Sequence, residues 1–98
     1  MSTTLFFESK YSQNETKSVL YEAMDKQLNF ISTRLKKFNN ECAEYEKKYN
    51  MQSDEFINKF ESGKLGDDEQ WFDWYASFKG RELWKKKYNI LRETTCKE

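Results

Sequence analysis

The strongest constraint on the fold is an apolar repeat that runs unbroken from Tyr21 to Tyr49. Apolar side chains recur at alternating intervals of three and four residues, the heptad spacing of a helix face packed against another helix. The repeat comprises Tyr21, Met24, Leu28, Ile31, Leu35, Phe38, Cys42, Tyr45 and Tyr49. Asn14 is a suitable N-cap, and the chain contains no proline that would interrupt the repeat. The pattern predicts one helix over residues 14–49, about 50 Å long at 1.5 Å per residue.

Two shorter helices are expected after a break at residues 50–52. Ser53 is a suitable N-cap for a helix over residues 54–62, because its hydroxyl can accept a backbone N–H. Gly63 then supplies the left-handed residue that commonly follows a helix. The turn after it leads into a third helix, which we expect over residues 68–92.

Together these elements predict an all-α fold in which a long helix, a short linking helix and a second long helix form an antiparallel helical hairpin. The single domain spans residues 14–92, between a flexible arm at 1–13 and a frayed tail at 93–98. Gly80 lies inside the third helix, where glycine costs about 1 kcal/mol relative to alanine, so a close contact with another helix is expected there.

The long helix extends further than the third helix can easily cover. A chain of this length also buries only about 60–65% of its unfolded surface, so that burial against a second copy would add stability. We therefore expect a homodimer that forms a bundle or coiled coil. The expected dimer seam comprises Tyr21, Met24, Leu28 and Ile31.

The residue types that most enzymes and metal sites use are absent or scattered. The chain has no histidine, which removes the commonest general base and metal ligand. Cys42 and Cys96 lie too far apart for a metal-ligand pair, and the three glycines form no phosphate-binding loop. Helix capping or an acidic docking surface explains Asp67, Asp68, Glu69 and Asp73 better than a calcium loop does. We expect a protein that is not an enzyme and has no cofactor.

The same sequence gives expectations about location and partners. It lacks the basic start and apolar run of a signal peptide, and no apolar stretch approaches the roughly 20 residues that span a bilayer. We expect a cytoplasmic protein with reduced thiols. The net charge of zero argues against nucleic acid as a partner. The run Lys85–Lys87 suits the negative end of a helix dipole, although phosphate contact there is left open.

Aromatic side chains crowd the first half of the third helix. Phe72 shares a side with Ala76 and Leu83 and is assigned to the hairpin core, whereas Trp71 and Trp74 adjoin polar residues and are assigned to a wetter interface. Tryptophan and tyrosine are enriched at binding hot spots, although filling the core would also explain these aromatic residues. The expected partner-binding residues are Trp71, Trp74, Tyr75, Phe78, Asp67, Asp68 and Asp73.

Residues 45–91 contain a series of short motifs in a fixed order. The motifs are Tyr-Asn-Met at 49–51, Ser-Asp-Glu-Phe at 53–56, Phe-Glu-Ser-Gly-Lys-Leu-Gly-Asp-Asp at 60–68 and Phe-Asp-Trp-Tyr at 72–75. This order resembles a family of small archaeal and bacterial proteins associated with antitoxins of type II toxin–antitoxin pairs. The resemblance covers about half of the chain and leaves residues 1–40 outside it.

The resemblance implies an antitoxin-like protein that masks the surface of a cognate toxin, with a helix lying in a groove of the partner. An acidic surface would suit a toxin whose active cleft is basic. The alternative is a self-assembling helical scaffold, or structural homodimer, that has no toxin partner.

Overall fold

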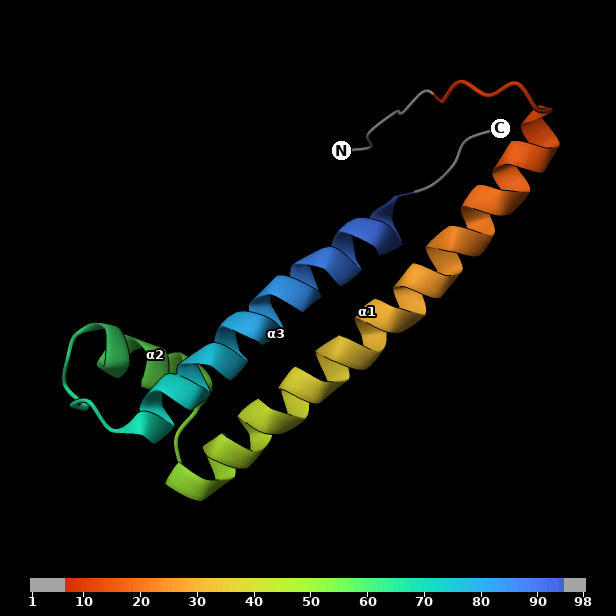
Figure 1. The fold of residues 1–98 in the computed structure, drawn as a ribbon. Helices are drawn as coiled ribbons and strands as arrows, with labels where there is room; N and C mark the ends of the chain where they lie inside the picture. The colour runs from red at the N-terminus through yellow and green to blue at the C-terminus, as the bar shows by residue number, and fades with distance from the viewer. Residues whose placement is uncertain (1–6, 95–98) are drawn as a thin grey trace.

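The computed structural model describes residues 7–94 and is an all-α helical hairpin (Figure 1). It contains α1 (Gln13–Tyr49), α2 (Ser53–Glu61) and α3 (Glu69–Glu93). α3 runs antiparallel to α1, and α2 lies beside the first turns of α3 at the closed end of the hairpin (Figure 1). The predicted fold class and hairpin arrangement are confirmed. Part of the predicted arm and most of the predicted tail, including Cys96, lie outside the described residues.

The two ends of α1 are set by local hydrogen bonds. Ser12, rather than Asn14, is the N-cap: its Oγ accepts the Glu15 N–H at 3.1 Å and donates to Glu15 Oε1 at 2.9 Å. Both bonds involve the Ser12 hydroxyl, which accepts from the Glu15 backbone and donates to the Glu15 side chain. The helix ends at Asn50, which has a left-handed φ of 51° and donates its N–H to the Glu46 carbonyl. Asparagine tolerates this conformation better than most residues.

The start of α2 differs from the expectation, because Ser53 is its first residue and does not serve as its N-cap. Gln52 occupies the N-cap position and makes no side-chain capping bond. The Ser53 N–H is instead donated to Glu46 Oε2 at 3.0 Å. At the other end, Gly63 has a φ of 75°, so its predicted left-handed conformation is confirmed.

The heptad face of α1 packs against α3 and forms the long seam of the hairpin. Ile31 and Cys42 are buried in it, and the seam residues between them are half-buried. The helices approach closely at Gly80, where an added Cβ would lie 2.6 Å from Phe38 Cε1. The close contact expected at Gly80 is therefore confirmed.

The expected orientation of α3 about its own axis is wrong. Phe72, which was assigned to the core, is 51% exposed, and Ala76 and Leu83 are exposed beside it. Trp74, which was assigned to the interface, is completely buried. The inner face of α3 instead contains Trp74, Ser77, Arg81, Trp84, Tyr88 and Leu91. This orientation of α3 turns the large Trp74 and Trp84 rings toward α1. It also places the polar residues Ser77 and Arg81 on the inner face, so this face does not stand out in the sequence as an apolar stripe.

The expected dimer seam is largely covered within the chain itself. Ile31 is 3% exposed, and Met24 and Leu28 are half-buried. The last turn of α3 reaches this region, since Leu91 lines a surface groove together with Met24 and Leu28. Tyr21, also in that groove, is partly exposed. Leu28 and Ile31 therefore need no second copy to cover them.

Candidate protein-binding surface

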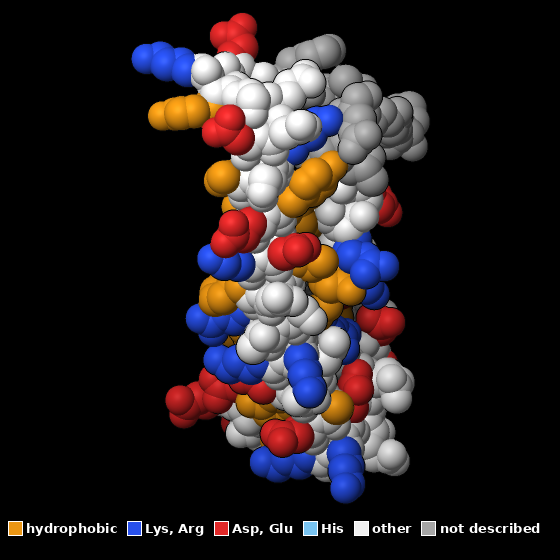
Figure 2. Space-filling view, turned by 90° about the vertical axis from the view of Figure 1, so that its right-hand side faces the viewer, with side chains coloured by type: hydrophobic (Ala, Val, Ile, Leu, Met, Phe, Trp, Pro, Cys, Tyr) orange, Lys and Arg blue, Asp and Glu red, His pale blue; other side chains and the backbone are white. Residues whose placement is uncertain are grey.

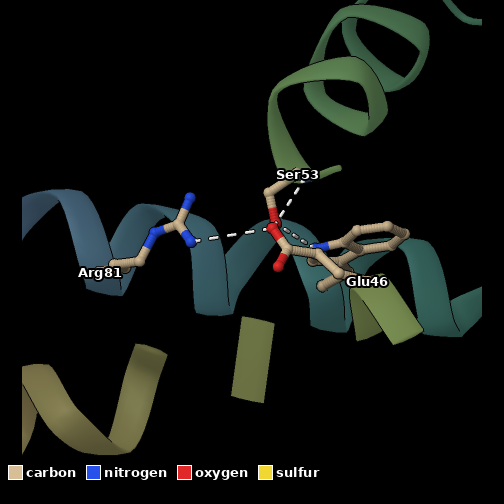
Figure 3. Close-up of polar contacts among 4 residues, drawn as sticks. Glu46, Ser53 and Arg81 are labelled. Atoms are coloured by element: carbon tan, nitrogen blue, oxygen red, sulfur yellow. Dashed lines mark hydrogen bonds and ion pairs between the residues drawn. The ribbon is translucent and has the colours of Figure 1, made fainter. Parts of the chain in front are cut away.

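Trp74 joins the three helices at the closed end of the hairpin. Its ring stacks on Phe56 of α2 with centroids 4.0 Å apart, and on Tyr45 and Tyr49 of α1 at 5.6 and 5.7 Å. Its Nε1 donates to Ser53 Oγ at 3.1 Å (Figure 3). A fully buried ring with a satisfied N–H is a core residue, so Trp74 does not offer a surface to a partner.

A polar contact beside Trp74 joins the same three helices (Figure 3). Glu46 Oε2 accepts the Ser53 N–H and lies 4.0 Å from Arg81 Nη1. Both charged side chains are mostly buried, so solvent screens their attraction less than it would on the surface. The carboxylate also lies at the N-terminus of α2, where negative charge suits the helix dipole. Glu46 therefore performs the capping role that the sequence assigned to Ser53.

Cys42 is completely buried next to this polar contact. Burial raises the pKa of its thiol, while Arg81 and the hydrogen bond with Ser53 oppose the increase. A buried thiol held protonated is a poor nucleophile and a poor metal ligand. Within residues 7–94, no group of three or more Cys, Asp or Glu side chains is arranged to hold a metal ion.

The surface at this end of the hairpin is both aromatic and acidic, and we call it the acidic aromatic surface. Phe72 stands on Phe60, with ring centroids 5.3 Å apart in an edge-on contact, and Phe60 packs on Tyr75 at 4.9 Å. Phe60 and Tyr75 are half-buried, so Phe72 is the most exposed of the three rings. Three exposed carboxylates complete the surface: Asp67, Asp68 and Asp73.

The structure brings together only part of the predicted partner-binding set. The three aspartates are exposed, whereas Trp71, Tyr75 and Phe78 are half-buried and Trp74 is completely buried. Trp71 packs against Tyr49 at 4.8 Å, which directs much of its ring into the core. Burial raises the pKa of Tyr45, and the nearby carboxylate of Asp73 raises it further. Asp73 therefore also interacts with a half-buried residue of α1.

The sequence reasoning missed Phe72 as the exposed aromatic residue. A usable signal was present, because Phe72, Leu83 and Ile90 are separated by 11 and 7 residues and so share one helix face. All three are at least half exposed on the side of α3 that points away from α1. Figure 2 shows a different face of the molecule, on which hydrophobic side chains also lie among Lys, Arg, Asp and Glu side chains.

Comparison with protein-family models, with curated proteins and with solved structures found no match. None of the described helices is both long enough and apolar enough to cross a bilayer.

Proposed function

We propose that the chain is a non-enzymatic protein-binding module of the antitoxin type, and that it masks a partner through the acidic aromatic surface. The observation that supports this proposal is the exposure of Phe72 on a base of half-buried aromatic rings, with the exposed carboxylates of Asp67, Asp68 and Asp73 within five residues of it in the sequence. An exposed aromatic anchor with a polar rim is the usual composition of a binding hot spot.

The charge of this part of the chain indicates what kind of partner would fit. Residues 41–82 contain eleven acidic and six basic side chains, a net charge of −5. A partner with a basic, partly apolar cleft would therefore be attracted to this end of the hairpin and oriented by it. A toxin that acts on RNA or on nucleotide phosphates would have such a cleft.

A binding measurement with the product of the neighbouring gene tests the proposal. We expect the Phe72→Ala variant to bind this product at least about 30-fold more weakly than the unaltered chain does, the loss typical of a hot spot. Leu83→Ala is the matched control, because Leu83 is equally exposed on the same face of α3 but lies three turns away. Equal affinity of the Phe72→Ala variant and the unaltered chain, or no binding by either, would contradict the proposal.

The alternative, a self-associating helical scaffold, is favoured by a different observation. α1 has 37 residues and α3 has 25, so the first turns of α1 extend past the end of α3 (Figure 1). Val19, in this extension, is 65% exposed. If the chain is a scaffold, sedimentation at micromolar concentration will show a dimer that Val19→Asp dissociates while helix content is unchanged. A monomeric unaltered chain would exclude this alternative.

A further inference from the structure

The hairpin brings together two stretches of sequence that contain basic residues and no acidic ones. Residues 26–40 of α1 and residues 83–92 of α3 each contain four basic side chains and neither aspartate nor glutamate. The stretches lie side by side, because Phe30 contacts Trp84 with ring centroids 5.7 Å apart and Leu28 shares a groove with Leu91 and Arg92. We call the combined surface the basic band. Its cations are Lys26, Arg34, Lys36, Lys37, Lys85, Lys86, Lys87 and Arg92.

The zero net charge of the whole chain gives no indication of this band, because acidic residues elsewhere cancel its charge. The band has a charge of +8, residues 41–82 have −5, and the remaining residues at the two ends of the chain balance the difference. The hairpin is therefore polarised, with an acidic closed end and a basic middle. A surplus of this size around the middle of the hairpin is the electrostatic footprint expected of a polyanion-binding site.

The cations of the band are accessible and largely without carboxylate partners. All eight residues are exposed. Within the described part of the chain, only Lys26 among them lies within 4.0 Å of a carboxylate, in a 3.3 Å contact with Glu22. The other seven have no carboxylate this close among the described residues, so an anionic ligand that displaced counterions from them would gain free energy.

An aromatic pair lies in the middle of the band. Phe30, which is 47% exposed, meets Trp84 in an edge-on contact between the two helices. Arg34 lies over the Phe30 ring at 5.3 Å, and Lys87 lies over the Trp84 ring at 4.7 Å. Each ring thus has a cation from its own helix beside it. Aromatic surface next to unpaired cations is the composition with which proteins bind unpaired bases and their phosphates.

We propose that the basic band binds single-stranded nucleic acid. The phosphates would contact the cations on both helices, and a base would stack on the exposed part of the Phe30 ring. An acidic protein segment would satisfy the cations as well, but it would make no particular use of the aromatic pair. This activity is independent of the acidic aromatic surface, which lies at the closed end of the hairpin.

Fluorescence anisotropy with labelled single-stranded RNA and DNA oligonucleotides of mixed sequence tests the proposal. We expect micromolar binding at low salt that weakens steeply as salt is added, with a log–log slope of about −0.7 per phosphate contacted. A variant with Lys85, Lys86 and Lys87 changed to glutamine should bind at least about tenfold more weakly. The matched control changes Lys47, Lys48 and Lys64 to glutamine, which removes the same charge from exposed positions outside the band.

A second variant separates base stacking from charge attraction. Phe30→Leu keeps an apolar side chain beside Trp84 and leaves every cation in place, so we expect about fivefold weaker binding with an unchanged salt slope. Circular dichroism of each variant confirms that the hairpin is folded. The proposal is overturned if no oligonucleotide binds, or if the two lysine variants lose affinity equally. It is also overturned if Phe30→Leu binds normally and polyglutamate competes as well as unlabelled oligonucleotide, because the band would then fit an acidic protein.

Discussion

The indole of Trp74 and the ring of Phe56 are stacked with their planes 1° apart, and both side chains are completely buried. This contact attaches α2 to α3 and sits against α1, so it is the packing centre of the closed end. We expect Trp74→Ala to lower the free energy of unfolding by about 3–5 kcal/mol, as truncation of large core residues does. Phe72→Ala, at an exposed position, should cost less than about 1 kcal/mol. Urea denaturation measures both, and similar losses for the two variants would contradict the assignment.

Gly80 provides a second test of the packing. Alanine normally stabilises a helix by about 1 kcal/mol relative to glycine. Here the added methyl group would lie 2.6 Å from the Phe38 ring, so we expect Gly80→Ala to destabilise the hairpin by about 1–3 kcal/mol. The double variant Gly80→Ala with Phe38→Leu removes the clash, and thermal unfolding should show it recovering part of the loss. A more stable single variant would mean that the helices are further apart than described.

The contribution of Glu46 to stability can be compared with that of a surface carboxylate. Glu46→Ala removes the acceptor of the Ser53 N–H and the carboxylate near Arg81, and we expect it to cost about 1–3 kcal/mol. Glu44→Ala is the control, because Glu44 is an exposed carboxylate on the same helix. Denaturation midpoints that fall equally in the two variants would show that Glu46 contributes no more than a surface charge.

The buried thiol predicts a loss of stability at alkaline pH. The folded state raises the pKa of Cys42 above its ordinary value of 9.0, so the unfolded chain releases this proton first as the pH rises. Deprotonation then favours the unfolded state by up to about 1.4 kcal/mol per pH unit. The contribution is fully present below pH 9.0 and is lost as the pH rises through the folded-state pKa.

Urea denaturation between pH 7 and 10 checks this expectation, with Cys42→Ala as the comparison. The alanine variant should be less stable at pH 7 because a small cavity remains, but its stability should fall less between pH 9 and pH 10. Tyr45, whose pKa is also raised above 10.0, should produce a further decrease at higher pH in both proteins. Parallel pH profiles would show that the thiol does not contribute.

The heptad of α1 predicted the seam because each of its members is apolar or aromatic, and Ile31 and Cys42 are indeed buried there. The Ser-x-x-Glu pattern from Ser12 to Glu15 is a known sequence signature of a helix start, but the expected N-cap was Asn14. The orientation of α3 about its own axis could not be predicted from the sequence pattern, because the polar residues Ser77 and Arg81 interrupt the apolar stripe on its inner face. Arg81 can lie on the inner face because Glu46 of α1 lies close to its guanidinium group. The sequence of α3 alone gives no information about this partner.

The two candidate surfaces also differ in how far they could be predicted from the sequence. The carboxylates of the acidic aromatic surface are close in sequence, so their grouping was visible before the fold was known. The basic band joins stretches that are more than 40 residues apart, and only antiparallel pairing of α1 with α3 places them together. The whole-chain charge therefore does not describe how charge is distributed along the hairpin.

The fit of Gly80 against Phe38 also limits how the two long helices can slide. A shift of α3 by one heptad would leave the heptad pattern of α1 intact but would place Asp73 or Lys87 opposite the Phe38 ring, where an added Cβ lies within 2.6 Å of the ring. The same shift would separate Arg81 from Glu46. These two contacts therefore favour the observed register of the seam over a shift by one heptad. The acidic aromatic surface and the basic band consequently keep a fixed spacing along the hairpin.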